Sequence, residues 1–218
     1  MATWAIGDIH GCLNALETLL ALIRPVEDDV IVVLGDVVDR GPETRGTIDR
    51  ILQLGTECRL VTIMGNHEEM MLSALEGGRW LESWLRHGGQ SVLDSYGGDP
   101  AAVPAEHMAF LQGGAPYWFN ERSIFVHAGL EPGKPLDVQT GEWLRWRKLI
   151  GNEPVFAEGY RVIAGHTPQP QGVPGSWPGW LAIDTHAYAG GWLSAVEAES
   201  GRLLQANERR EAREGRAW

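Results

Sequence analysis

The first third of the chain alternates between short apolar runs and amphipathic segments. Apolar runs occupy residues 3–6, 30–34 and 59–64, and each of them meets a glycine at its end. Between these runs, apolar residues recur at helical spacing over 12–23 and again from Pro42 to Leu54. A β-α-β-α-β series of this kind predicts an α/β fold in which neighbouring strands are at least partly parallel.

The remaining chain combines helical pieces with further short strands. Residues 66–112 predict helices interrupted by glycine pairs, at 77–78, 88–89 and 97–98. We expect one more helix over 140–150 and a loop rich in proline and glycine over 168–179. Further strands are expected over 123–126, 160–164, 180–183 and 192–197. Together these elements predict a single catalytic domain over 1–206 and a charged tail over 207–218, either mobile or a frayed helix.

Composition and charge narrow the class of protein. With 218 residues, 44% of them hydrophobic and 22% charged, the chain has the composition of a globular domain. Its net charge of −11 argues against a nucleic-acid partner, because phosphate backbones repel an acidic surface. No run approaches the ~18 apolar residues of a membrane helix, and the N-terminus lacks a secretory pattern. The two cysteines lie outside any CxxC motif, which fits a reduced cytoplasm. We expect a cytoplasmic protein that is a monomer and does not bind membranes.

Residues of the types that bind metal ions follow five of the expected strands. In open α/β sheets the loops beyond the carboxyl ends of the strands form the ligand crevice, so these side chains should meet at one rim. A lone aspartate there is usually a turn or cap residue and a lone histidine is usually structural, but recurrence at five strand ends argues against that interpretation. The residues are Asp8, His10, Asp36, Asn66, His127 and His166, and His67 follows Asn66 directly.

This set of side chains suits divalent cations. Two carboxylates, three imidazoles and one amide oxygen form a mixed shell that manganese, iron and zinc accept. Two divalent cations would outweigh the charges of Asp8 and Asp36, so the site would attract a phosphate dianion. Two metal ions about 3.5–4 Å apart can clamp a phosphoryl group and turn a bridging water into hydroxide. We therefore predict a dinuclear site, with Mn²⁺ as the first choice and iron or zinc as alternatives.

Several sequence blocks resemble the signature of serine/threonine-type phosphoprotein phosphatases. The first three are Gly7-Asp8-Ile9-His10-Gly11, Gly35-Asp36-Val37-Val38-Asp39-Arg40-Gly41 and Gly65-Asn66-His67-Glu68. The later blocks are His127-Ala128-Gly129 and Gly165-His166-Thr167-Pro168. The resemblance covers about residues 3–200 and is to the compact bacterial and lambda-phage-like form within the calcineurin-like metallophosphoesterases. It implies an α/β fold built as a β-sandwich of mixed sheets flanked by helices.

The resemblance also implies roles for individual residues. Asp8 and His10 would bind the first metal ion, Asp36 would bridge the two ions, and the second ion would be bound by Asn66, His127 and His166. His67 would protonate the leaving group and be oriented by Asp39, while Arg40 would hold phosphate oxygens. Simple chemistry agrees, because a carboxylate restores the pKa that nearby metal ions lower in a histidine, and a guanidinium offers two donors to phosphate. Taken alone, Asp39 could instead cap the following helix, and Arg40 could form a solvent-exposed ion pair.

Two further regions bear on the rim of the site. The family's second phosphate-binding arginine follows a Trp-x-Arg pattern, which Trp143-Leu144-Arg145 matches; we choose Arg145, with Arg147 as the competitor. Where relatives often have Asp-Thr-Gly-Ala, this chain has Asp184-Thr185-His186-Ala187. His186 is therefore either a contact at the rim or an exposed loop residue. The loop 168–179 and the segment 80–96 are expected to overhang the site.

These features predict a metal-dependent phosphoric monoester hydrolase. The main expectation is a protein phosphatase that hydrolyses phosphoserine and phosphothreonine, with phosphotyrosine as an option, in proteins or peptides by direct attack of a hydroxide bridging two metal ions. The alternative is a symmetrical dinucleoside tetraphosphatase or another small-molecule phosphohydrolase on the same site. Asp39 and Asn66-His67-Glu68 resemble the protein-phosphatase side of this choice. A binding module without catalysis is disfavoured because every expected ligand position is intact.

Overall fold

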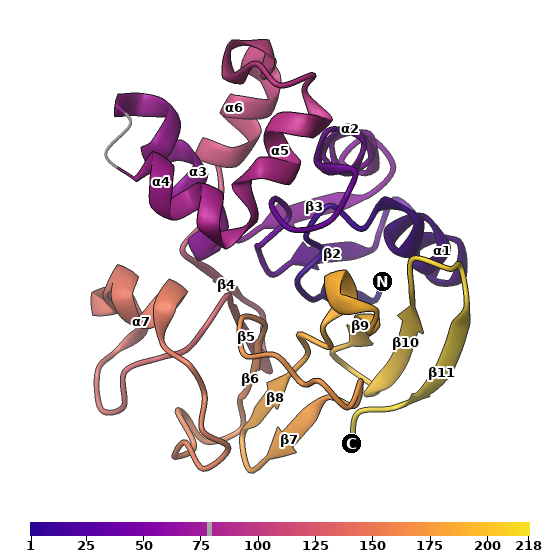
Figure 1. Cartoon of the computed structure of the whole chain (residues 1–218). Helices are drawn as coiled ribbons and strands as arrows, with labels where there is room; N and C mark the ends of the chain where they lie inside the picture. Colours follow the sequence, from indigo (N-terminus) through magenta and orange to yellow (C-terminus); the bar gives the residue numbers. More distant parts are fainter. Residues whose placement is uncertain (78–79) are drawn as a thin grey trace.

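Two mixed β-sheets pack face to face between layers of helices in the computed structural model, which describes residues 1–77 and 80–218 (Figure 1). Within these residues the first sheet has the strand order β11-β10-β9-β1-β2-β3. Its strands are β1 (Thr3–Ile6), β2 (Val30–Val33), β3 (Arg59–Thr62), β9 (Leu193–Glu197), β10 (Arg202–Ala206) and β11 (Ala212–Arg216). The second sheet has the order β4-β5-β6-β8-β7. Its strands are β4 (Tyr117–Phe119), β5 (Ser123–Val126), β6 (Arg161–Ala164), β7 (Gly175–Trp177) and β8 (Trp180–Ala182).

Each sheet contains three neighbouring parallel strands, and all of them except β3, at the edge of the first sheet, are largely buried. β1, β2 and β3 are parallel in the first sheet, and β5, β6 and β8 are parallel in the second. Alternate side chains point to opposite faces, so one set fills the space between the sheets and the other set packs under the helices. The residues between the sheets include Ala5, Val32, Leu34, Phe125, Ile163 and Leu181. Burial on both faces explains why these strands appear in the sequence as continuous apolar runs.

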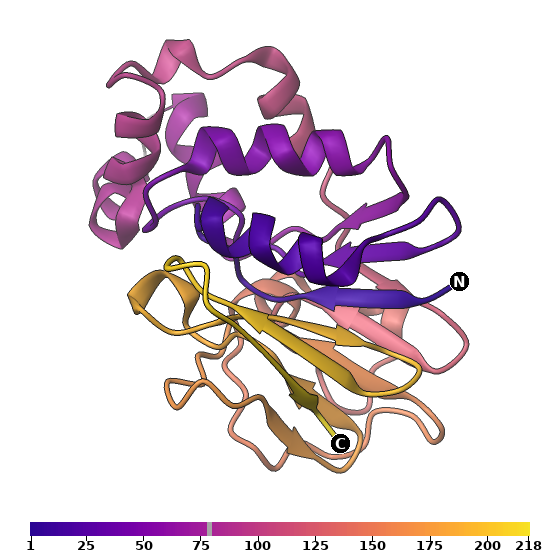
Figure 2. The same ribbon diagram turned by 90° about the vertical axis from the view of Figure 1, so that its right-hand side faces the viewer.

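Helices cover both outer faces of this sandwich. α1 (Leu13–Ile23) and α2 (Thr44–Leu54) lie on the outer face of the first sheet, as Figure 2 shows. α7 (Gly141–Trp146) packs on the second sheet through Leu144. The short 3-10 turns are η2 (Pro100–Ala102), η3 (Leu136–Val138) and η4 (Ala187–Ala189). Among all these described elements, no helix is both long and apolar enough to cross a membrane.

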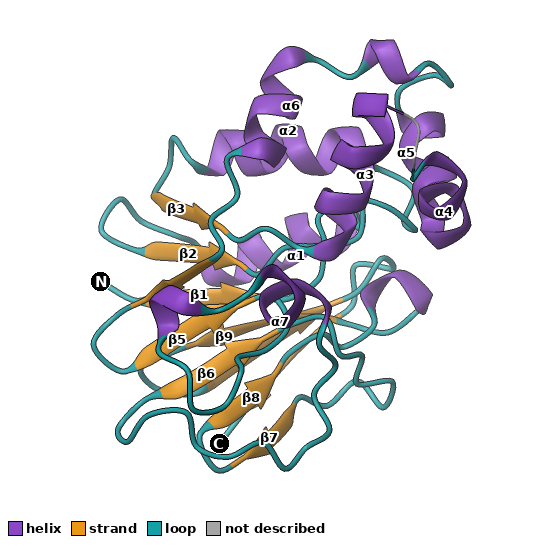
Figure 3. Ribbon diagram, turned by 90° about the vertical axis from the view of Figure 1, so that its left-hand side faces the viewer, coloured by secondary structure: helices purple, strands orange, loops and turns teal. Residues whose placement is uncertain are grey.

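A second group of helices follows β3 and packs beside α2 (Figure 3). It begins with α3 (Asn66–Gly77) and continues with α4 (Leu81–Trp84), the kinked π-helical turn η1 (Leu85–Gly89), α5 (Gln90–Ser95) and α6 (Ala105–Gln112). We call residues 80–112 the helical insert. It contacts α2 and α3, and α3 begins at the edge of the sheet where the expected site residues lie.

The predicted fold class is confirmed, and the expected strands are present with small differences at their ends. The helix expected over 140–150 is shorter because the backbone is extended at Arg147. β4, β7 and β10 were not predicted; β4 and β7 have three residues each, too few to form a pattern. The glycine pair 88–89 lies within η1, whereas the break expected at Gly77–Gly78 includes Gly78, which lies outside the described residues.

The C-terminal segment differs from the mobile tail expected over 207–218. Residues 212–216 form β11, which pairs antiparallel with β10 at the edge of the first sheet. Every residue of β11 is exposed, so no hydrophobic pattern marks this strand. Backbone pairing with β10 and two side-chain contacts hold this segment in place. Arg213 donates to Gln205 (2.7 Å), and the Arg161 guanidinium lies 3.6 Å from the centre of the Trp218 ring.

Candidate active site

The predicted site residues meet where the parallel strands of both sheets end. Asp8 and His10 follow β1, Asp36 follows β2, and Asn66 and His67 open α3 just after β3. From the second sheet, His127 follows β5 and His166 follows β6. All of these side chains are buried except that of His166, which is partly buried. The arrangement matches the crevice expected beyond the carboxyl ends of the strands.

The loops that carry these residues hold one another through the backbone. The N–H groups of Ile9 and His10 both donate to the carbonyl of Asp36, at 3.1 and 2.8 Å. The buried Glu68 carboxylate accepts N–H groups from Asp36 (2.8 Å), Val37 (2.7 Å) and Gly65 (2.9 Å). Several site residues adopt the left-handed backbone region, which costs energy outside glycine and is typical of functional sites. They are His10, Asp36, Asp39, Arg40 and His166.

Each predicted ligand histidine donates one ring N–H to a backbone carbonyl. The pairs are His10 Nδ1 with Val38 O (2.8 Å), His127 Nδ1 with Leu34 O (2.8 Å) and His166 Nε2 with Trp146 O (3.1 Å). The second ring nitrogen of each histidine therefore keeps a lone pair for the centre of the site, as in metal-binding histidines. Burial lowers the pKa of His10 to about 3 and of His166 to about 4, so both rings are neutral near pH 7.

Electron pairs converge at the centre, and those of Asn66, His127 and His166 have no proton between them. The Asn66 carbonyl oxygen lies 2.9 Å from His127 Nε2 and 3.0 Å from His166 Nδ1. The Asp36 carboxylate reaches both sides, with Oδ1 3.4 Å from His127 Nε2 and Oδ2 3.5 Å from His10 Nε2. Acceptors that face acceptors in a buried place need a cation, so the residues present fit a divalent metal ion.

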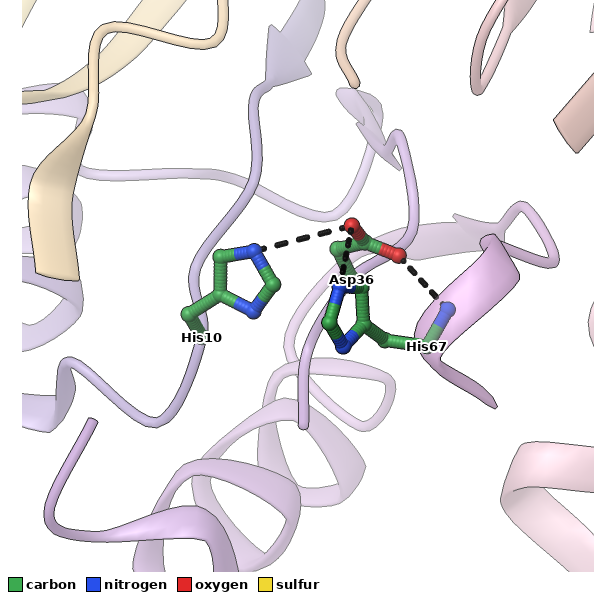
Figure 4. A group of neighbouring side chains, drawn as sticks. All are labelled: His10, Asp36 and His67. Atoms are coloured by element: carbon green, nitrogen blue, oxygen red, sulfur yellow. Dashed lines mark hydrogen bonds and ion pairs between the residues drawn. The ribbon is translucent and has the colours of Figure 1, made fainter. Parts of the chain in front are cut away.

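Asp36 belongs to both groups of potential ligands. His10, Asp36 and His67 form one group, which Figure 4 shows, and Asp36, His127 and His166 form the other. Within each group the potential ligand atoms lie within 4.8 Å of one another. The shared carboxylate fits the bridging role predicted for Asp36. The first group contains His67 where the sequence led us to expect Asp8.

Asp8 lies at the site but is turned toward another loop. Its carboxylate accepts the backbone N–H of His166 (3.0 Å). Burial, together with Asp184 and Asp36, raises the pKa of Asp8 well above its usual value. Burial also raises the pKa of Asp184 to about 6. Asp184 therefore adds a further buried carboxylate beside Asp8 and Asp36, and no role was predicted for it from the sequence.

His67 and Asp39 form a closely bonded pair. His67 Nδ1 lies 2.5 Å from Asp39 Oδ2, and His67 Nε2 lies 3.9 Å from Asp36 Oδ2. Burial alone would lower the pKa of His67, but the carboxylates of Asp36 and Asp39 raise it above its ordinary value. Burial raises the pKa of Asp39 despite this contact. The geometry fits the predicted pairing of a histidine acid with an orienting carboxylate.

The two predicted phosphate-binding arginines have different partners. Arg40 donates to His10 Nε2 (2.8 Å), and its guanidinium lies 4.6 Å from the centre of the Tyr188 ring. Arg145 forms a two-point ion pair with Glu69, at 2.8 and 3.2 Å. The pKa of His127 is lowered, mainly by burial and to a smaller extent by the nearby positive charge of Arg145. The competing Arg147 stacks on Trp143 instead, 5.0 Å from the ring centre.

The rim contains both expected and unexpected residues. His186 stands where the resemblance places a glycine and adopts the left-handed backbone (φ 67°), and its Nε2 lies 2.9 Å from the Tyr188 hydroxyl. It is therefore a partly buried neighbour of the site. In the segment 80–96, Trp84 Nε1 donates to Asp39, whereas Trp177 of the loop 168–179 stacks on Trp180. No role was predicted from the sequence for Glu68, Glu69, Trp84, Asp184 or Tyr188, although Glu68 and Asp184 stood inside segments that resemble the family.

Known proteins share both sequence and fold with this chain. The family described as calcineurin-like phosphoesterase matches residues 1–194. A symmetrical bis(5'-nucleosyl)-tetraphosphatase from Janthinobacterium sp. is 29% identical over 175 residues, covering 71% of this chain and 58% of the relative. Another, from Dechloromonas aromatica, is 42% identical over 137 residues, covering 61% of this chain and 45% of the relative. The chain thus spans about half the length of the curated relatives it matches.

Solved structures resemble the whole chain at low sequence identity. One, described as a candidate diadenosine tetraphosphatase, has a TM-score of 0.69 at 22% identity and covers 100% of this chain and 94% of its own. A cold-active protein-tyrosine phosphatase of a Shewanella species has a TM-score of 0.69 at 19% identity and covers 98% of this chain and 80% of its own. At these identities the two structures establish the fold alone. With the family match over residues 1–194, the chain belongs to the calcineurin-like phosphoesterases, which are metal-dependent phosphoester hydrolases.

Proposed function

We propose that this phosphoesterase hydrolyses dinucleoside tetraphosphates symmetrically, so that each substrate gives two nucleoside diphosphates. The observation that carries this substrate class is the name shared by the curated relatives, symmetrical bis(5'-nucleosyl)-tetraphosphatase. The proposal replaces the protein phosphatase favoured by the sequence analysis as the first candidate. The symmetrical dinucleoside tetraphosphatase was the alternative expected from the sequence, and it would use the same site residues.

The donor set supports two divalent cations, with Mn²⁺ as our first choice. The residues that would hold them are Asp8, His10, Asp36, Asn66, His127 and His166. When bound, two such cations supply Lewis acidity toward phosphoryl oxygens and lower the pKa of a water molecule. Arg40 and Arg145 would hold the remaining phosphoryl oxygens through paired N–H donors. His67, held by Asp39 on Nδ1, would give the proton on Nε2 to the oxygen of the departing group.

A phosphoprotein phosphatase remains the second candidate because of one observation at the site. His67 and Asp39 form a fully buried acid pair, and the serine or threonine alkoxide needs a proton more than a nucleoside diphosphate does. The block Asn66-His67-Glu68 resembles the same class. This observation supports a reaction with a poor leaving group and says nothing about the rest of the substrate.

The test compares three substrates with the Mn²⁺-loaded protein. They are diadenosine tetraphosphate, a phosphoserine peptide and a phosphotyrosine peptide, and Asp36→Asn is the control that lacks the bridging carboxylate. We expect preferential cleavage of the nucleotide, with adenosine diphosphate as the sole nucleotide product. Preferential release of phosphate from a peptide would favour the second candidate. Activity on none of the three, with metal bound, would favour a binding module.

A further inference from the structure

A hydrogen-bonded chain runs from the helical insert into the site. Trp84 Nε1 donates to Asp39 Oδ1 at 2.7 Å, and the other oxygen, Oδ2, lies 2.5 Å from His67 Nδ1. The side chains of Trp84, Asp39 and His67 are buried, at 0%, 0% and 1% exposure. The far nitrogen of His67 faces Asp36 at the centre of the site. The indole therefore lies two contacts away from the reacting group without touching it.

The backbone of the insert is shaped to bring the indole to this place. The chain kinks at Gly88 (φ 112°), inside η1, between α4 and α5. A Cβ on Gly89 would lie 2.5 Å from ring atoms of Trp84, so only glycine leaves the ring its room. A Cβ on Gly88 would lie 2.7 Å from Arg40 Cγ, and the Gly88 carbonyl accepts the Arg40 N–H at 3.1 Å. The glycine pair thus seats the insert on both Asp39 and Arg40.

The indole N–H completes the bonding of a carboxylate that has no access to water. With His67 on one oxygen and Trp84 on the other, each oxygen of Asp39 has a partner. Without the indole, Oδ1 would be a buried acceptor with no donor among the hydrogen bonds of the described residues, which is unfavourable. The carboxylate would then turn to find another donor, and His67 would turn with it. A group that orients the partner of an acid or base is a recurring feature of catalytic sites.

We propose that Trp84 is a positioning residue, which holds Asp39 so that His67 Nε2 points its proton at the leaving oxygen. This inference rests on the proposed function, in which a phosphoester or phosphoanhydride is hydrolysed. In that reaction the oxygen of water forms the new bond to phosphorus, and the bond to the leaving oxygen breaks with its electron pair. The leaving oxygen takes the proton from His67 Nε2. The proton of the attacking water passes to solvent, and His67 regains a proton from solvent.

The decisive experiment compares leaving groups in the Mn²⁺-loaded protein. Phenyl phosphate has a poor leaving group that needs the proton, whereas 2,4-dinitrophenyl phosphate has a good one that does not. For Trp84→Phe we expect kcat on phenyl phosphate to fall about 10–100-fold, as for other groups that orient a site residue. The fall on the dinitrophenyl ester should be about threefold or less, with KM nearly unchanged. The matched control is Trp80→Phe, a residue of the same insert whose side chain is 52% exposed.

A second variant and a spectroscopic measurement cover a failure of Trp84→Phe to fold. Gly89→Ala keeps the indole but displaces it, so it should give the same dependence on the leaving group. In zinc-loaded protein, the proton between His67 Nδ1 and Asp39 should give a downfield resonance by nuclear magnetic resonance. Trp84→Phe or Gly89→Ala should shift or broaden that resonance, and Trp80→Phe should leave it unchanged.

The outcomes separate this inference from the proposed function. Equal slowing of both esters, or an unchanged resonance, would show that Trp84 is only a packing residue and would overturn the inference alone. A wild-type protein that binds metal but hydrolyses neither the esters nor diadenosine tetraphosphate would overturn the proposed function and this inference with it. Slowing confined to phenyl phosphate would support this inference, and cleavage of diadenosine tetraphosphate by the wild type would support the proposed function.

Discussion

Replacing Asp184 with asparagine should stabilise the metal-free protein at neutral pH. Asp184 is buried, and burial raises its pKa from 3.8 to about 6, with a smaller contribution from repulsion by Asp36. A group with a raised pKa contributes stability below its unfolded pKa and loses that contribution as the pH rises through the folded value. A shift of about 2 pKa units corresponds to about 3 kcal/mol of unfolding free energy. For a chain of this length that is about 6–12 °C in Tm.

The assay is unfolding of the metal-stripped protein between pH 4 and pH 8. The difference between Asp184→Asn and wild type should be small near pH 4, grow through pH 5 to 6 and level off above about pH 7. Asparagine can still accept the His186 N–H that Asp184 Oδ1 accepts at 3.0 Å, so the loop keeps its contact. The control is Asp28→Asn, which changes an exposed carboxylate and should give a flat difference. A Tm difference that does not depend on pH would refute the reasoning, because the cost of burying a charged Asp184 would then not be the cause.

Three further changes test other parts of the site and the insert. Asp36→Asn should reduce bound divalent cation, measured by mass spectrometry of the metal, and remove nearly all hydrolysis; retention of most activity would contradict the bridging role. Arg145→Gln should weaken inhibition by inorganic phosphate about tenfold, or about 1.4 kcal/mol, whereas Arg147→Gln should not; equal effects would contradict the choice of Arg145. His107→Phe replaces a buried imidazole whose two nitrogens are both hydrogen-bonded. Urea unfolding should show a loss of about 1–3 kcal/mol in unfolding free energy, with catalysis unchanged. A loss below about 0.5 kcal/mol would contradict this structural role.

The strand ends made most of the site accessible to sequence reasoning. A continuous apolar run followed by glycine and a ligand-type residue gives both the strand and the direction of its end. The topology rule for parallel strands then brings Asp36 and His127 together although they come from different sheets. Neither step needs the length of the intervening chain, which is why the helical insert between them did not disturb the prediction.

Contacts that depend on tertiary packing left no such pattern. Trp84 lies 45 positions from Asp39 in the sequence and reaches it only because the chain kinks at Gly88. Glu68 stood inside a recognised block, but its bonds to Asp36 and Val37 in the loop after β2 join residues 32 and 31 positions apart. β11 is exposed at every position, so burial could not encode it. In each case the missing information is the relative placement of elements.

The two arginines show why the substrate was harder to predict than the reaction. The Arg40 guanidinium lies over the Tyr188 ring and donates one N–H to His10 Nε2, and a phosphate can bind that N–H once His10 Nε2 has another partner. Glu69 instead occupies the N–H edge of Arg145, the same edge that a phosphate would bind. A substrate that binds this edge of Arg145 must displace Glu69, and it does so more readily when it carries more negative charge. A chain of four phosphates carries more charge than a single phosphoserine, so this ion pair supports the proposal of a polyphosphate substrate.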